Sequence, residues 1–97
     1  MPLLSNLQSR RSEILAIAKK HGIKTVRVFG SVARGEETPE SDIDLLIDLE
    51  RPVKDGLGFI GFKLDMEDML GRKVDIVFET GIYHRLRDII LNEARPL

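Results

Sequence analysis

Three aspartates stand in apolar, strand-like segments of this 97-residue sequence. Asp42 and Asp44 alternate with apolar residues in the segment Asp42–Asp48, and Asp75 lies in a later apolar run. Because residues i and i+2 of a strand point to the same side, about 7 Å apart, Asp42 and Asp44 present two carboxylates on one face. Three carboxylates on adjacent strands form an all-oxygen site that suits Mg²⁺ or Mn²⁺ rather than zinc. Two such ions, about 3.5–4 Å apart, support an in-line phosphoryl or nucleotidyl displacement.

A second feature, Gly30-Ser31, follows the strand-like segment Thr25–Phe29. A glycine permits close backbone approach of an anion, a serine adds a hydroxyl, and a helix N-terminus attracts negative charge. Arg34, one helical turn after Ser31, would add positive charge for a triphosphate. These residue types indicate a phosphate-binding turn next to the carboxylates.

Each feature also has an ordinary structural explanation. A Gly-Ser pair after a strand commonly forms a turn and a helix cap, and alternating aspartates are typical of a strand with one solvated face. Asp75 could pair with Arg72 or Lys73, and Arg34 could be an exposed surface arginine. Taken one at a time, the features leave both explanations open.

The elements that would position these residues alternate along the chain. Ser5 and Gln8 form a capping-box pattern, which predicts the start of a first helix. Periodicity and turn residues favour an α/β or α+β fold, with a small mixed sheet of about three strands packed by helices. The expected elements are a helix ending near His21, strands at 25–29, 42–48 and 74–78, a helix with Phe59, Phe62, Met66 and Leu70 that ends at Gly71, and a last helix with Leu86, Ile89 and Ile90.

Composition points to one small domain without a disulfide framework, since the chain contains no cysteine. The charge is uneven: residues 1–34 carry seven basic groups and one acidic group, whereas residues 35–97 carry eight basic and fifteen acidic groups. The acidic part is the part suited to holding cations. The start, Met1–Asn6, lacks the pattern of a signal peptide, and no apolar run approaches the ~20 residues of a membrane span. We therefore expect a cytoplasmic protein.

Taken together, the segments Gly30–Gly35 and Ser41–Asp48 resemble the minimal nucleotidyltransferases, the MNT branch of the DNA polymerase β superfamily. The mark of that family is Gly-Ser, ten residues and then Asp-x-Asp, and residues 32–41 are the ten. Lys73–Val77 matches the later strand that carries the family's third carboxylate. The resemblance extends over nearly the whole chain and implies a polymerase-β-like nucleotidyltransferase fold, with residues 1–97 as a single minimal domain.

The resemblance also implies a role for each motif residue. Asp42 and Asp44 would hold two Mg²⁺ ions, and Gly30 with Ser31 would hold the β- and γ-phosphates of ATP. Asp75 would ligate the catalytic ion and help to deprotonate the attacking hydroxyl, which displaces pyrophosphate from the α-phosphate.

Members that resemble this sequence typically pair with a small helical HEPN protein, a ribonuclease toxin, and serve as its antitoxin. The resemblance therefore implies a type VII-like antitoxin that transfers AMP from ATP to a tyrosine of the toxin, in a hetero-oligomer. No membrane partner and no direct nucleic-acid substrate are expected. Two alternatives remain: a non-catalytic, nucleotide-binding antitoxin that acts by complex formation, and transfer to a small molecule such as an aminoglycoside.

Other suggestive residues are assigned elsewhere. Gly56–Gly61 has the glycine spacing of a dinucleotide-binding fold, but it follows a loop with Pro52 rather than a strand, so we expect a loop that leads into a helix. His21 lies at an expected helix end, where it meets the helix dipole. Tyr83 and His84 precede the last helix and are expected in capping or surface packing.

Overall fold

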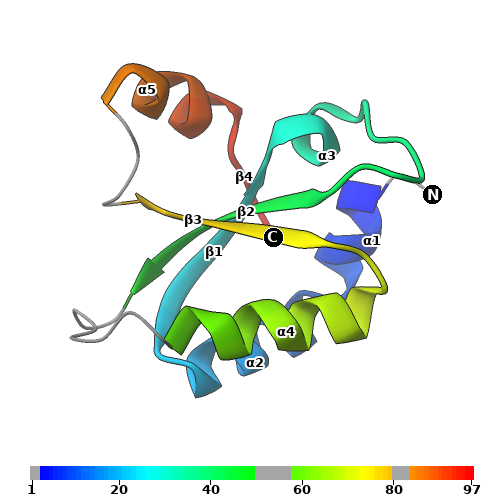
Figure 1. Ribbon diagram of the computed structural model, residues 1–97, viewed down its shortest axis with the longest axis vertical. Helices are drawn as coiled ribbons and strands as arrows, with labels where there is room; N and C mark the ends of the chain where they lie inside the picture. Colours follow the sequence, from blue (N-terminus) through cyan, green and yellow to red (C-terminus); the bar gives the residue numbers. More distant parts are fainter. Residues whose placement is uncertain (1–2, 50–57, 80–83) are drawn as a thin grey trace.

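The computed structural model describes residues 3–49, 58–79 and 84–97 (Figure 1). The elements are α1 (Leu3–Ser9), α2 (Arg11–Lys20), β1 (Ile23–Phe29), α3 (Gly30–Arg34), β2 (Ile43–Leu49), α4 (Gly58–Leu70), β3 (Val74–Phe78), α5 (His84–Glu93) and β4 (Arg95–Pro96). This order confirms the expected mixed α+β fold. Within these ranges, no helix has both the length and the apolar character needed to cross a bilayer.

The strands form one mixed sheet in the order β3-β2-β1-β4. β1 runs antiparallel to β2 and to β4, whereas β2 and β3 are parallel. β4 was not expected from the sequence, because two residues are too short to show strand periodicity. It pairs Arg95 with Val28 and Pro96 with Arg27, and its position at the edge tolerates a proline, which cannot donate to a ladder.

The helices pack around the sheet, and α3 shares a core with α2 and α4 through Val32. In Figure 1, α2 and α4 lie below it, and α3 and α5 lie above it. The alternation expected for β2 is confirmed, since Ile43, Leu45 and Ile47 are buried in the core. Leu46 points to the opposite face and is also fully buried. The remaining core side chains are Leu7, Ile14, Ala18, Ile23, Val26, Val28, Val32, Phe62, Met66 and Val74.

The N-terminal helix differs from the expected one, because the chain bends at Arg10 and divides it into α1 and α2. The Arg10 amide donates to the Leu7 carbonyl at 3.1 Å, a tighter turn than the helical one. Its guanidinium pairs with Glu13 at 3.0 Å. The bend lets α1 pack against α3 as well as α2.

The expected capping box is also wrong, because Ser5 lies inside α1 rather than before it. A distant residue serves this end instead: the Leu3 amide donates to Glu37 Oε1 at 2.9 Å. This hydrogen bond lowers the pKa of Glu37, since it favours the charged carboxylate. The loop between α3 and β2 is thereby tied to the N-terminal helix.

Two alanine substitutions in α4 test this core. Phe62 is fully buried, so Phe62→Ala should lower the free energy of unfolding by about 3–5 kcal/mol through lost contacts and a cavity. Leu64, two residues along the same helix, is 58% exposed, so Leu64→Ala should change the free energy of unfolding by about 0.5 kcal/mol or less. Urea unfolding measures both, and equal costs would contradict this arrangement of α4.

Candidate active site

Asp44 and Asp75 lie directly beside each other on neighbouring strands. The parallel register of β2 and β3 pairs their Cα atoms, and the ladder begins where the Ile43 amide donates to the Lys73 carbonyl at 2.9 Å. Strands in a sheet are about 4.8 Å apart, and paired residues point to the same side. The expectation that Asp44 and Asp75 lie on adjacent strands is therefore confirmed.

Asp42 lies immediately before β2, at the end of a loop that Arg72 holds in place. The Arg72 guanidinium donates to the carbonyls of Thr38 and Ser41, at 3.0 and 3.2 Å. Arg72 is thus occupied at the loop and is not the partner of Asp75. In the described ranges, no ion pair includes Asp75, which is exposed.

Gly30 forms the turn on the other side of Asp44. In the antiparallel register Phe29 is opposite Asp44, and Gly30 then begins α3 with a φ of 74°. A Cβ atom at Gly30 would lie 2.1 Å from Asp44 Oδ2, closer than atoms can approach. The turn predicted at this position is confirmed, and only a glycine leaves space there for the carboxylate.

Ser31 and Arg34 are both in α3, at the same end of the sheet. Ser31 is the second residue of the helix, and its carbonyl accepts the Glu36 amide at 2.9 Å. Arg34 is 46% exposed and pairs with Glu36 at 3.2 Å. It also pairs with Glu93, and hydrogen bonds to Glu93 and Glu36 raise the pKa of Arg34.

Glu93, at the end of α5, belongs to this group of residues but was not predicted. Its Oε2 accepts the Gly30 amide at 3.1 Å, and its Oε1 accepts a hydrogen bond from Arg34 Nη1. Its side chain is only 18% exposed. No motif marks it in the sequence, since it lies 63 residues after Gly30 in an ordinary amphipathic helix.

The surroundings of Asp44 shift its ionisation. Burial raises the pKa of Asp44, and the negative charges of Asp75, Asp42 and Glu93 raise it further, while Arg34 lowers it. Carboxylates so placed favour a bound cation, because each unpaired negative charge costs free energy that a nearby positive charge offsets. The all-oxygen donor set fits Mg²⁺.

The described residues contain no three His, Cys, Asp or Glu side chains that already converge as metal ligands. Carboxylates of like charge repel, so closing Asp42, Asp44 and Asp75 around one point requires a positive charge between them. The backbone brings these residues together, and the assignment of a metal to them stays a prediction.

His21 and Gly61 lie away from this group, where α2 meets α4. His21 ends α2, and its Nε2 lies 2.8 Å from Asp65 of α4, while its ring packs against Gly61, where a Cβ atom would be 2.7 Å from Cε1. Gly61 is therefore a packing glycine within α4. Gly56 and Tyr83 are outside the described residues, as is the side chain of His84.

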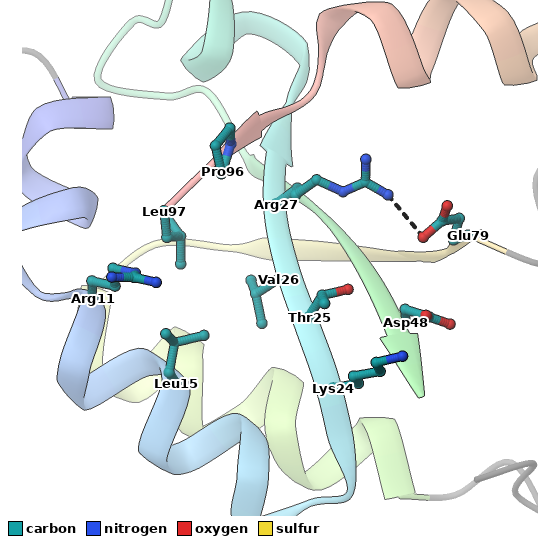
Figure 2. Close-up of a pocket in the computed structure, with 10 residues that line it drawn as sticks. All are labelled: Arg11, Leu15, Lys24, Thr25, Val26, Arg27, Asp48, Glu79, Pro96 and Leu97. Carbon is teal, nitrogen blue, oxygen red and sulfur yellow. Dashed lines mark ion pairs between the residues drawn. The ribbon is translucent and has the colours of Figure 1, made fainter. Parts of the chain in front are cut away.

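A cavity of about 420 Å³ lies at the opposite end of β1, beside the C-terminal strand (Figure 2). None of the predicted site residues lines it. Two of the charged residues that line it, Arg27 and Glu79, form an ion pair with each other at 2.8 Å. The residues around it are Arg11, Leu15, Lys24, Thr25, Val26, Arg27, Asp48, Glu79, Pro96 and Leu97.

Sequence comparison relates this arrangement to known proteins. Residues 11–97 match the family described as the nucleotidyltransferase domain. A Methanocaldococcus jannaschii protein, named as a candidate protein adenylyltransferase, is 38% identical over 89 residues, which are 92% of this chain and 95% of that protein. The protein adenylyltransferase MntA of Thermococcus cleftensis is 32% identical over 78 residues, which are 80% of this chain and 78% of that protein.

Solved structures share the fold. One described as a candidate minimal nucleotidyltransferase has a TM-score of 0.82 and 47% identity, over 97% of this chain and 95% of that one. A toxin-antitoxin crystallised with AMP-PNP has a TM-score of 0.73 over 88% of this chain and 69% of that one. At 17% identity, the second likeness is one of fold.

The position of Asp75 predicts the titration of Asp44. Asp75→Asn should lower the pKa of Asp44, because removing a neighbouring negative charge makes the ionised form less costly. Carboxyl-carbon NMR titration measures this pKa. Asp48→Asn, four residues along β2, is the control and should leave it unchanged; an equal effect of both variants would contradict the proximity of Asp44 and Asp75.

Proposed function

We propose, from the premise that this chain belongs to the nucleotidyltransferase domain family, that it transfers AMP from ATP to a hydroxyl of a partner protein. The chain is a nucleotidyltransferase by that membership. The observation that carries the proposal is the contact of Gly30 with the Asp44 carboxylate, beside Asp75. This contact supports the proposal, because nucleotidyl transfer requires a phosphate-binding turn next to a pair of carboxylates.

In this proposal the start of α3 binds the triphosphate. The Gly30 amide and the Ser31 hydroxyl donate to the β- and γ-phosphates, and Arg34 balances their charge. The positive φ of Gly30 and the absence of a Cβ atom let the phosphates approach the backbone. All three of these phosphate-binding groups belong to one short segment, residues 30–34, which joins β1 to the loop before β2.

On the other side, Asp42, Asp44 and Asp75 would hold two Mg²⁺ ions, which when bound supply positive charge for the phosphates and the leaving pyrophosphate. Asp75 is exposed, so an incoming hydroxyl has access to its carboxylate. That carboxylate accepts the hydroxyl proton as the oxygen bonds to the α-phosphorus. The bond from the α-phosphorus to the bridging oxygen then breaks, and pyrophosphate leaves.

The acceptor we propose is a tyrosine of a HEPN-type ribonuclease toxin, which makes this chain an antitoxin of the cytoplasm. The names of the relatives support a protein acceptor, since one is the protein adenylyltransferase MntA. The toxin-antitoxin with AMP-PNP supports both a toxin partner and an adenine nucleotide for this fold. The HEPN class and the tyrosine rest on the resemblance in the sequence motif alone.

Intact mass tests this function. The protein encoded by the adjacent gene, incubated with this chain, ATP and Mg²⁺, should gain whole AMP units. Asp44→Asn should reduce the rate by about 100-fold or more, since it removes a carboxylate from the reacting centre. Asp48→Asn on the same strand is the matched control and should retain activity.

The other outcomes separate the alternatives. A stable complex without any gain in mass would favour neutralisation by binding alone. Absence of a complex, together with AMP transfer to an aminoglycoside, would move the acceptor to small molecules. Full activity of Asp44→Asn would contradict the proposed site.

Two glycine substitutions test the phosphate turn. Gly30→Ala should abolish most transfer, because the new Cβ atom displaces the Asp44 carboxylate. Gly22→Ala is a close control: its φ is 75°, against 74° for Gly30, but no atom lies within 4 Å of its Cβ position. Both variants carry backbone strain of roughly 1–2 kcal/mol, so both should melt at a lower temperature, and only Gly30→Ala should lose activity. Equal activities at a temperature where both are folded would be contrary to the proposal.

A further inference from the structure

The Glu93 carboxylate occupies two of the groups assigned above to the triphosphate. Its Oε2 accepts the Gly30 amide at 3.1 Å, and its Oε1 accepts from the Arg34 guanidinium. One amide hydrogen makes one good hydrogen bond. The positive charge of a guanidinium that is paired with a carboxylate is already compensated by that carboxylate. A phosphate oxygen and the Glu93 carboxylate therefore compete for the same donors.

The contact of Glu93 with Gly30 and Arg34 is less exposed to solvent than an ordinary surface ion pair. Glu93 is 18% exposed, whereas Glu36, the other acid on Arg34, has a side chain that is 65% exposed. Glu93 is also a negative charge near Asp44, so its position is held against repulsion. The Gly30 amide and Arg34 together provide the compensating attraction.

We propose that Glu93 is an internal carboxylate that competes with the β- and γ-phosphates of ATP for the Gly30 amide and Arg34. This inference rests on the proposed function, because it takes these donors as the triphosphate site. A nucleotide binds only in the fraction of molecules in which Glu93 has turned away, so the apparent affinity falls by that fraction. AMP has no β- or γ-phosphate and escapes the competition.

The chain around Glu93 limits how the carboxylate is released. Arg95, two residues later, pairs with Val28 in the sheet, and Val28 is two residues before Gly30. The backbone of this segment is thus fixed close to the phosphate turn. Rotation of the Glu93 side chain, rather than movement of α5, is the change that frees the donors, and the competitor stays close enough to return after pyrophosphate leaves.

Calorimetric titration of the full chain with AMP-PNP and with AMP, both with Mg²⁺, tests the competition. Glu93→Gln should bind AMP-PNP about 3- to 10-fold more tightly than the wild type, because the competing charge is gone. Its affinity for AMP should stay within about 2-fold. Glu36→Gln is the matched control, because it also removes an acid from Arg34 but leaves the Gly30 amide bonded to Glu93. Its affinity for AMP-PNP should rise by about 2-fold or less.

The results distinguish this inference from the proposed function. Weaker or unchanged binding of AMP-PNP by Glu93→Gln, with clear binding by the wild type, would overturn the competition and leave the nucleotide site intact. Equal gains for AMP-PNP and AMP would also overturn it. If neither protein binds AMP-PNP, both the inference and the proposed function fail.

A measurement on the wild type covers the case in which the variant does not fold. With ¹³C-labelled protein, the Glu93 carboxyl resonance should shift when AMP-PNP and Mg²⁺ are added, and should stay in place with AMP. A Glu93 resonance that does not move while AMP-PNP binds would overturn the proposal.

Discussion

The Asp44 carboxylate occupies the space that a side chain at Gly30 would need, and the arrangement of this end of the sheet depends on that fit. A side chain at Gly30 would overlap Asp44 Oδ2, so the carboxylate keeps its position only with glycine at this turn. The same turn starts α3 and thereby directs Ser31 and Arg34. On the other side, the parallel pairing of β2 and β3 sets Asp75 beside Asp44. One steric constraint thus fixes the segment proposed to bind phosphate relative to two carboxylates.

The electrostatics of this region work against the stability of the fold. Burial raises the pKa of Asp44, and the negative charges of Asp75, Asp42 and Glu93 raise it further. Sites that perform chemistry commonly keep such unfavourable charge because a ligand or metal compensates it. Arg34 supplies part of the compensation here through its pair with Glu93, which is also why Glu93 and a triphosphate contend for it.

The departures from the sequence-based expectations share one cause, which is contact between residues far apart in the chain. The first helix divides at Arg10, and α1 packs on α3 as well as α2. Its start is bonded to Glu37 rather than to Ser5, and Arg72 holds the loop before Asp42 instead of pairing with Asp75. Local spacing carries no information on such contacts, since they depend on how the elements pack.

The sequence by itself determined the alternating elements, the family resemblance and the positions of Asp42, Asp44, Asp75 and the Gly-Ser turn, because strand and helix periods are local properties of the chain. The roles of these residues in catalysis remain predictions. Tertiary structure alone decided that Asp44 and Asp75 are register partners, that β4 completes the sheet, and that Glu93 reaches the phosphate turn. Glu93 is 63 residues from Gly30, and only the packing of α5 against α3 brings its carboxylate to that amide.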